Sequence, residues 1–232
     1  MSNPDDSAYQ PPEDLKSRLA ASYDLIAPEY NSWTVKHSSG PRMIWLNKLL
    51  QQLPSPLTKK IEILELGAGA GIPTTKAILG HSPDIHVLAN DLSSQQLSLL
   101  QSNLSDYADR ITTLEGDMLS LSPSPGTITA VVGMYSLIHL PRAEQSLLIS
   151  RIHSWLQPGG VLLANFSEMA SEEHVNENWM GEGGWVYWAG WGVDKTKEII
   201  KDTGFEIIED AVVSDVVDAN FWWVLARKKA AE

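Results

Sequence analysis

The chain lacks cysteine, and its 232 residues contain no apolar stretch long enough to span a membrane. Without cysteine, a disulfide framework, a thiol nucleophile and a thiolate-bound metal are excluded. Basic residues are scarce as well, because 17 Lys and Arg stand against 29 Asp and Glu, for a formal net charge of −12. This charge repels nucleic-acid phosphates and anionic membranes, so we expect neither as a partner. The polar, acidic N-terminus is unlike a targeting signal, and we expect a cytoplasmic location.

The chain divides into three parts by composition. Residues 1–12, rich in Ser, Asp and Pro, are expected to form a flexible arm. Residues 13–57 contain two helical patterns, the first stopping near Pro28 and the second ending before Pro54. From residue 58 to 232, strand and helix patterns alternate, which favours a parallel sheet with helices on both faces.

The expected strands lie at 61–66, 85–89, 111–114, 128–134 and 161–166, with a closing hairpin at 205–213 and 220–226. The expected helices lie at 74–79, 94–104, 142–156 and 195–203. Pro158-Gly159-Gly160 predicts the turn from the last crossover helix into the fifth strand. Residues 168–193 form an aromatic segment that includes the stretch from Asn178 to Gly192, which has no clear periodicity.

The most informative segment runs from Ile61 to Gly71. An apolar strand ends in Glu65-Leu66, and glycines follow at positions 67, 69 and 71 before a helical pattern. A strand, a glycine turn and a helix start let backbone N–H groups approach a nucleotide-like ligand. Ile72 stands where the dinucleotide fingerprint needs its third glycine, so an NAD-linked oxidoreductase is disfavoured.

This segment resembles motif I of the class I S-adenosylmethionine-dependent methyltransferases, E/D-x-G-x-G-x-G. The resemblance extends over roughly residues 20–228 and is close to the small-molecule branch related to ubiquinone and menaquinone methyltransferases. It implies a Rossmann-like fold with a mostly parallel seven-stranded sheet, helices on both faces, and a helical lid at 13–57. It also implies S-adenosyl-L-methionine as cofactor and S-adenosyl-L-homocysteine as product.

The resemblance also implies a set of cofactor contacts. Asp91 would accept hydrogen bonds from the ribose, although an Asp there could instead stabilise a helix N-terminus. Asp117 would accept from the adenine amino group, and Glu65 would steady the methionine amino group, directly or through water. Arg42 could neutralise the cofactor's carboxylate, and Tyr23 could reach it or simply pack in its helix. The expected cofactor-binding set is Tyr30, Glu65, Gly67, Ala68, Gly69, Gly71, Asp91, Leu92, Asp117, Met118 and Tyr135.

The acceptor half of the site rests on two further motifs. Residues 136–142 match the family sequence S-L-x-H-L-P-R beside the transferable methyl, so Tyr135, Ser136 and His139 are candidate substrate contacts. His139 is the candidate general base, and a structural bridge is the alternative. His37 could hang from the lid over the pocket, whereas His174 is expected in solvent.

The aromatic segment suits a flat apolar substrate or a cationic amine. Of the nine tryptophans, Trp185 and Trp188 are the candidate substrate contacts, or else they plug the core beneath a lid. Of Trp222 and Trp223, which alternate across a strand, we expect one in the core. No spacing of His and acidic residues suggests a metal site.

Three functions remain open. The leading one is methyl transfer to an O or N atom of a small hydrophobic or aromatic metabolite, in secondary metabolism. A cyclase or isomerase on the same fold is the second. A noncatalytic cofactor-binding subunit is the third. The sequence leaves the oligomeric state open.

Overall fold

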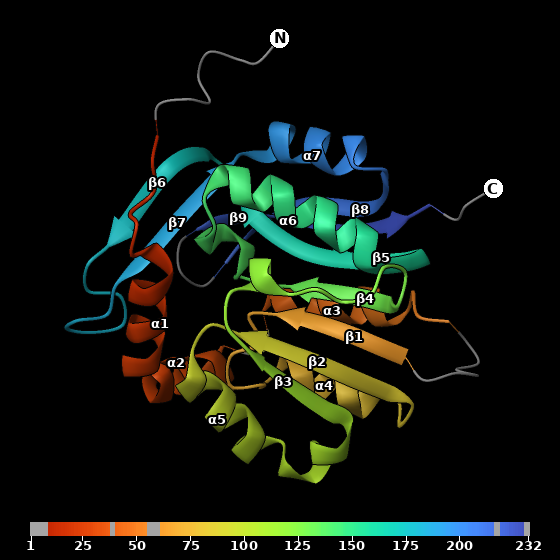
Figure 1. The fold of residues 1–232 in the computed structure, drawn as a ribbon, viewed down its shortest axis with the longest axis horizontal. Coiled ribbons are helices and arrows are strands. Elements are labelled where there is room, and N and C mark those ends of the chain that lie inside the picture. Colours follow the sequence, from red (N-terminus) through yellow and green to blue (C-terminus); the bar gives the residue numbers. More distant parts are fainter. Residues whose placement is uncertain (1–8, 38–39, 55–60, 216–218, 230–232) are drawn as a thin grey trace.

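The computed structural model describes residues 9–37, 40–54, 61–215 and 219–229. A seven-stranded sheet in the order β3-β2-β1-β4-β5-β9-β8 forms the middle layer (Figure 1). Its parallel strands are β1 (Ile61–Leu66), β2 (Ile85–Asp91), β3 (Ile111–Glu115), β4 (Ile128–Gly133) and β5 (Leu156–Ser167). β9 (Asn220–Lys228) inserts antiparallel between β5 and β8 (Phe205–Ser214). The predicted fold class is therefore confirmed.

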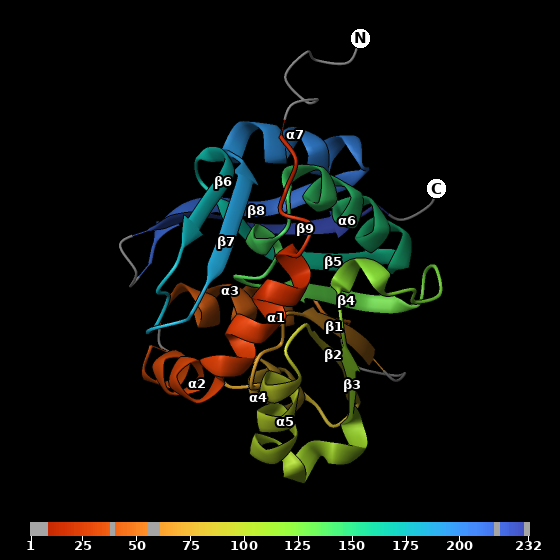
Figure 2. The same cartoon turned by 60° about the vertical axis from the view of Figure 1, so that its left-hand side comes forward.

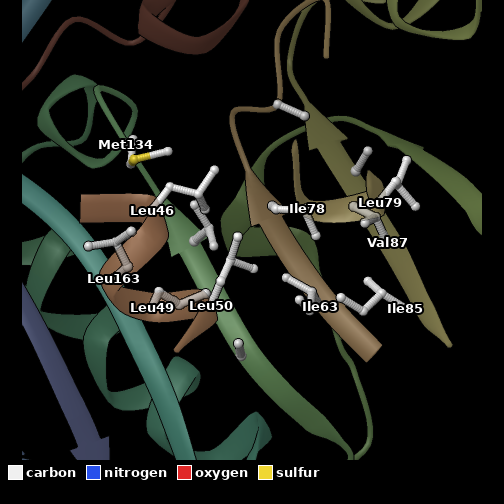
Figure 3. Packing of buried hydrophobic residues seen from close by; sticks show 14 of the residues in the cluster. Leu46, Leu49, Leu50, Ile63, Ile78, Leu79, Ile85, Val87, Met134 and Leu163 are labelled. Carbon is white, nitrogen blue, oxygen red and sulfur yellow. The ribbon is translucent and has the colours of Figure 1, made fainter. Parts of the chain in front are cut away.

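Helices cover both faces of this sheet because adjacent strand residues point to opposite sides. One face packs α3 (Pro41–Leu50), α4 (Thr74–His81) and α5 (Ser94–Asn103), and Figure 3 shows Leu46, Leu49 and Leu50 facing the strands. The other face packs α6 (Arg142–Trp155) and α7 (Val193–Asp202). Among the described residues, no helix has the length and apolar character that crossing a membrane requires.

Trp222 and Trp223 show this alternation on one strand. We expected one of them in the core, but both are buried, at 1% and 0% exposure. Trp223 packs with the α3 side and Trp222 with the α6 side, so each anchors one of the two hydrophobic layers.

Three local features differ from the expectation. The first expected helix does stop near Pro28, as α1 (Leu15–Leu25), but an unexpected helix, α2 (Ala27–Lys36), follows at once. Pro28 occupies the first turn of α2, where a missing N–H costs no bond. β5 begins at Leu156, so the Pro-Gly-Gly sequence lies inside the strand, next to a register shift opposite β4.

The third concerns the aromatic segment. Its end forms β7 (Val186–Trp191), which pairs antiparallel with β6 (Ala170–Asn176) as a separate two-stranded ribbon. Val, Tyr and Trp favour extended backbone, and this preference prevails despite the neighbouring glycines.

α1, α2 and the β6–β7 ribbon lie at the same end of the main sheet, where β1, β2, β3, β4 and β5 terminate (Figures 1 and 2). Asp24 fixes α1 to the start of α5, because its Oδ1 accepts hydrogen bonds from the Ser93 hydroxyl at 2.6 Å and from the Gln95 N–H at 3.0 Å. A carboxylate at a helix N-terminus is stabilised by the unpaired N–H groups and the helix dipole. This contact holds the expected lid against the core.

We predict that Asp24→Ala lowers the free energy of unfolding by roughly 0.5–2 kcal/mol, the usual cost of losing such a cap. Urea unfolding at neutral pH measures it. Ser98→Ala is the matched control. Ser98 is exposed on α5, the helix that Asp24 contacts, and its loss should leave the stability within about 0.5 kcal/mol of wild type. Equal stability of both variants would show that Asp24 does not hold the lid.

Candidate active site

The glycine turn after β1 uses its three glycines in two ways. All have positive φ, at 73° for Gly67, 56° for Gly69 and 76° for Gly71. A Cβ on Gly67 would lie 2.4 Å from the Ser136 Cβ, and one on Gly71 would lie 2.8 Å from the Leu100 Cγ. A Cβ on Gly69 would meet nothing closer than 3.7 Å. Gly67 and Gly71 therefore permit close packing, whereas Gly69 borders open space.

That space is a cavity between the strand ends and α1–α2. It brings together most of the expected cofactor residues, including the loops after β2 and β3. On its wall lie Tyr30, Gly67, Ala68, Gly69, Asp91, Leu92, Asp117, Met118 and Tyr135. Gly71 and Glu65 lie outside it.

Asp91 organises the centre of this cavity. Its Oδ2 accepts from the Gly69 N–H at 2.8 Å and its Oδ1 from the Ser93 N–H at 2.9 Å. Burial raises the pKa of the carboxyl, and these N–H groups oppose that rise. The cap of α5 is supplied by the Ser93 hydroxyl, which accepts from the Gln96 N–H. The helix therefore does not need Asp91 as its cap, and the carboxylate faces the cavity.

Asp117 lies at the β3 end of the first cavity, in the loop that follows this strand. Its Oδ1 accepts from the Leu119 N–H at 3.0 Å, which starts the short helix η2 (Met118–Ser120). Its Oδ2 lies 3.7 Å from the Nζ of Lys16 on α1, and Lys16 also pairs with Glu144 at 2.6 Å. The lid thus meets the core at this end through charges.

Glu65 lies behind the glycine turn. It is 4% exposed, and its Oε2 accepts from the Thr75 hydroxyl at 2.6 Å. Burial raises the pKa of Glu65 to about 8, while the Thr75 hydrogen bond and the Arg42 charge oppose the rise. Glu65 is therefore hydrogen-bonded within the protein, and its expected contact with the methionine amino group, directly or through water, stays a prediction.

A second cavity, of about 620 Å³, adjoins the first and is walled mainly by rings. Trp33 and His37 come from α2, Trp188 from β7 and Phe221 from β9. Two of the expected substrate residues, His37 and Trp188, therefore lie on this wall. His174 is exposed, as expected, yet it also borders the cavity, stacked on Trp188 with ring centroids 5.5 Å apart.

The other two expected substrate residues lie elsewhere. Ser136 lines the first cavity, and its hydroxyl donates to the Leu66 carbonyl. Trp185 packs beneath α1 outside both cavities, with the Arg18 guanidinium 4.3 Å from its ring centre and its backbone N–H donating to the Ser22 hydroxyl. Trp185 is thus buried in the core beneath the expected lid, which is the alternative to a substrate contact that the sequence left open.

Both cavities share a wall that contains His139, which lies at the end of η3 (Leu137–His139). The His139 Nδ1 lies 2.8 Å from the Tyr187 carbonyl oxygen, so Nδ1 carries the proton and donates it. The Nε2 therefore accepts, and the Tyr23 hydroxyl donates to it over 3.0 Å. Burial lowers the pKa of His139 to about 4, which keeps the ring neutral near pH 7. Burial also raises the pKa of Tyr23, which keeps its proton.

Tyr135 stands on the same shared wall with an unusual backbone. Its φ is 59°, and its N–H donates to the Asn165 Oδ1 at 2.6 Å. Its hydroxyl donates to the Asp215 carboxylate, and the Arg42 guanidinium carbon lies 4.7 Å from its ring centre. A positive φ at a large residue persists where the surroundings hold it, as these contacts do.

Sequence reasoning missed several wall residues. Gln96 is 1% exposed and lines the first cavity, and its amide has no hydrogen-bond partner among the described residues. The buried Thr34 hydroxyl, on the wall of both cavities, also lacks one within the described chain. Trp33, Trp179 and Phe221 line the second cavity. Gln96 and Phe221 lie in predicted elements, but the direction their side chains face was not visible, whereas Trp33, Thr34 and Trp179 lie where no helix or strand was predicted.

Residues 63–160 match a family described as a methyltransferase domain. The chain has a Rossmann-like methyltransferase fold. S-adenosylmethionine, the predicted cofactor, is the methyl donor that the sequence resemblance implies. The cavity fits that ligand, because Asp91 accepts, the Gln96 amide both donates and accepts, and Gly69 leaves room at the backbone. Such groups match a nucleoside joined to an amino acid.

Solved structures share the fold over nearly the whole chain. The 1,6-didemethyltoxoflavin N1-methyltransferase of Burkholderia thailandensis, with that compound and S-adenosylhomocysteine bound, has a TM-score of 0.69 and 16% identity over 97% of this chain and 93% of its own. DhpI, complexed with SAH, has a TM-score of 0.69 and 18% identity, covering 94% and 99%. The [4+2]-cyclase SpnF has a TM-score of 0.67 and 17% identity over 91% of this chain and 95% of its own. No curated protein sequence matches significantly.

Within the part of the chain that is described, no group of three or more His, Asp and Glu side chains is arranged to hold a metal ion. The ubiquinone-like affiliation of the chain stays a prediction.

We predict that Gly69→Val weakens S-adenosylhomocysteine binding more than about tenfold, because its methyl groups would fill the cavity and its φ of 56° disfavours a branched residue. Titration calorimetry measures the affinity. Gly126→Val is the control, since Gly126 also has positive φ but a Cβ there meets no atom within 4 Å. Unchanged affinity in folded Gly69→Val would contradict the assignment.

A second prediction follows from Glu65. An acid whose pKa is raised on folding, here from 4.5 to about 8, binds more protons folded than unfolded, so its contribution to stability falls as pH rises through that window. Glu65→Gln removes this loss, and the ligand-free variant should gain stability relative to wild type by at most about 1.4 kcal/mol per pH unit. Urea unfolding between about pH 5 and pH 8 measures the difference. A difference independent of pH would contradict the prediction.

Proposed function

We propose that this protein transfers a methyl group from S-adenosylmethionine to an oxygen of a small, hydrophobic aromatic metabolite. The observation that carries the proposal is the wall shared by the two cavities, where Tyr23 and His139 are hydrogen-bonded between a cofactor-type site and an aromatic site. Transfer to nitrogen, which the sequence left open, remains a variant of the same chemistry. A cytoplasmic location and a place in secondary metabolism rest on sequence alone.

The first cavity holds the cofactor through the residues described above. Asp91 after β2 and Asp117 after β3 offer carboxylates to it, Gly69 admits the ligand to the backbone, and Arg42 supplies a cation for a carboxylate. When bound, S-adenosylmethionine supplies a methyl group on an already activated sulfonium. The protein's share is then alignment, exclusion of water and control of the acceptor's proton.

Tyr23 and His139 can accept that proton. An acceptor hydroxyl beside Tyr23 would donate to the phenol oxygen while the Tyr23 proton passes to the His139 Nε2. The Tyr187 carbonyl holds the opposite nitrogen and stabilises the imidazolium so formed. The acceptor oxygen is left with the electron pair that forms the new bond to carbon.

This arrangement makes Tyr23 a predicted catalytic residue. Tyr23→Phe keeps the ring that packs edge-on against His139 at 5.6 Å but removes the hydroxyl, and turnover should fall by about 10²–10⁴-fold with cofactor affinity retained. His139→Ala should lower turnover likewise. Product analysis and calorimetry measure both, and His81→Ala on the exposed end of α4 is the control. Full activity of Tyr23→Phe would overturn the proton route.

The pH dependence gives an independent check. A His139 pKa near 4 leaves Nε2 able to accept well below neutrality, so kcat/KM should not fall on the acid side until about pH 5 or lower. An ordinary histidine would already be protonated near pH 6.5.

The similarity to SpnF favours one second candidate, a cyclase on the same fold. The experiment is incubation with S-adenosylmethionine and an acceptor, followed by quantification of S-adenosylhomocysteine. Formation of S-adenosylhomocysteine and methylated product in equal amounts supports methyl transfer. A product formed without S-adenosylhomocysteine supports the cyclase. Cofactor binding without any product would favour the noncatalytic alternative.

A further inference from the structure

The second cavity has a ladder of rings along one side. Tyr30, Trp33 and His37 stand on one side of α2, each lining the cavity. Tyr30 and Trp33 stack with centroids 6.0 Å apart, and Trp33 and His37 lie 4.8 Å apart. Tyr30 also meets Tyr23 edge-on at 5.4 Å. The ladder therefore runs from the Tyr23–His139 pair along the length of the lid helix.

The rings of this ladder contact one another in sequence. Aromatic side chains that contact one another lose little conformational freedom on binding and present a stiff, flat wall. Trp179 and Trp188 make a similar pair elsewhere on the cavity, edge-on with centroids 5.3 Å apart. Such walls select for shape, and they fit planar rings better than a flexible chain.

Charge restricts the ligand further. Among the described residues on this cavity, Arg42 is the Lys or Arg side chain and Asp215 the Asp or Glu side chain. The Arg42 guanidinium lies over the Tyr135 ring, and the Asp215 carboxylate accepts from the Tyr135 hydroxyl. Their charges cancel, so the wall provides no surplus for a phosphate. The same balance leaves no surplus negative charge for an ammonium group.

Size is the third restriction. A volume of about 620 Å³ lies within the range of roughly 300–1,000 Å³ that holds drug-sized ligands and far exceeds the needs of a single ring. Polar groups are present away from the ring ladder, at Asn176 and Asn220, where carbonyl or hydroxyl substituents of a ligand could be bound.

We infer that the acceptor is an uncharged, planar polycyclic compound that lies along the Tyr30–Trp33–His37 ladder and presents a phenolic or enolic hydroxyl to Tyr23. This inference rests on the proposed function, and it adds the acceptor's class and the residue that selects it. Trp33 is the selecting residue, since its ring occupies the middle of the ladder.

The test separates binding from transfer. Affinities for 2-hydroxyanthraquinone, phenol, tyramine and phosphoethanolamine are measured by calorimetry with S-adenosylhomocysteine present. The tricyclic phenol should bind at least about tenfold more tightly than the other three compounds. Trp33→Leu should weaken its binding about tenfold and leave phenol and S-adenosylhomocysteine binding nearly unchanged.

Val35→Ala, at an exposed position of the same helix, is the matched control and should change no affinity. If Trp33→Leu does not fold, Phe221→Leu, on β9 at the same cavity, tests the ring walls instead. Tighter binding of tyramine or phosphoethanolamine, or equal binding of phenol and the tricyclic compound, would overturn the inference, as would binding of none. If the tricyclic compound binds but is never methylated, the inferred class of ligand is supported and the proposed methyl transfer is contradicted.

Discussion

The site depends on how α1 is held, because this helix forms part of both cavities and contacts segments far apart in the chain. Its polar residues are bonded to α5, α6, the stretch before β7 and η3, through Asp24–Ser93, Lys16–Glu144, Ser22–Trp185 and Tyr23–His139. Several contacts of modest strength thus fix one helix. If α1 moved, the wall between cofactor and acceptor would lose Tyr23, and water would reach the reacting atoms.

The core was largely predictable because its signals are local. Alternating strand and helix patterns and the glycine turn place Gly69, Asp91 and Asp117 at the ends of adjacent strands, and parallel topology then brings them together. The first cavity accordingly contains most of the residues expected from sequence. Glu65 and Gly71 lie outside the cavity lining, since a motif gives the order of residues but does not show which of them reach the cavity.

The acceptor side was much less predictable because tertiary contacts determine it. Trp185 and Trp188 are three positions apart in one aromatic segment, yet Trp185 packs beneath α1 and Trp188 lines the cavity. That outcome follows from the β6–β7 pairing, which no periodicity revealed. Likewise α2 was missed at Pro28, and with it the ladder of Tyr30, Trp33 and His37. A proline that can begin a helix as well as end one is ambiguous without its neighbours.

The Tyr23–His139 hydrogen bond also separates the candidate functions physically. A cyclase or a binding subunit needs the cavities and the closed lid, but neither needs a histidine whose tautomer is fixed by the Tyr187 carbonyl and whose other nitrogen faces a phenol. A neutral, desolvated imidazole is a weak base on its own. Its basicity increases if a nearby negative charge develops as the acceptor loses its proton, and the positive charge of the methyl donor favours that loss at the same place. The arrangement therefore suits the proposed oxygen methylation, in which a hydroxyl proton must leave, better than either alternative on this shared fold.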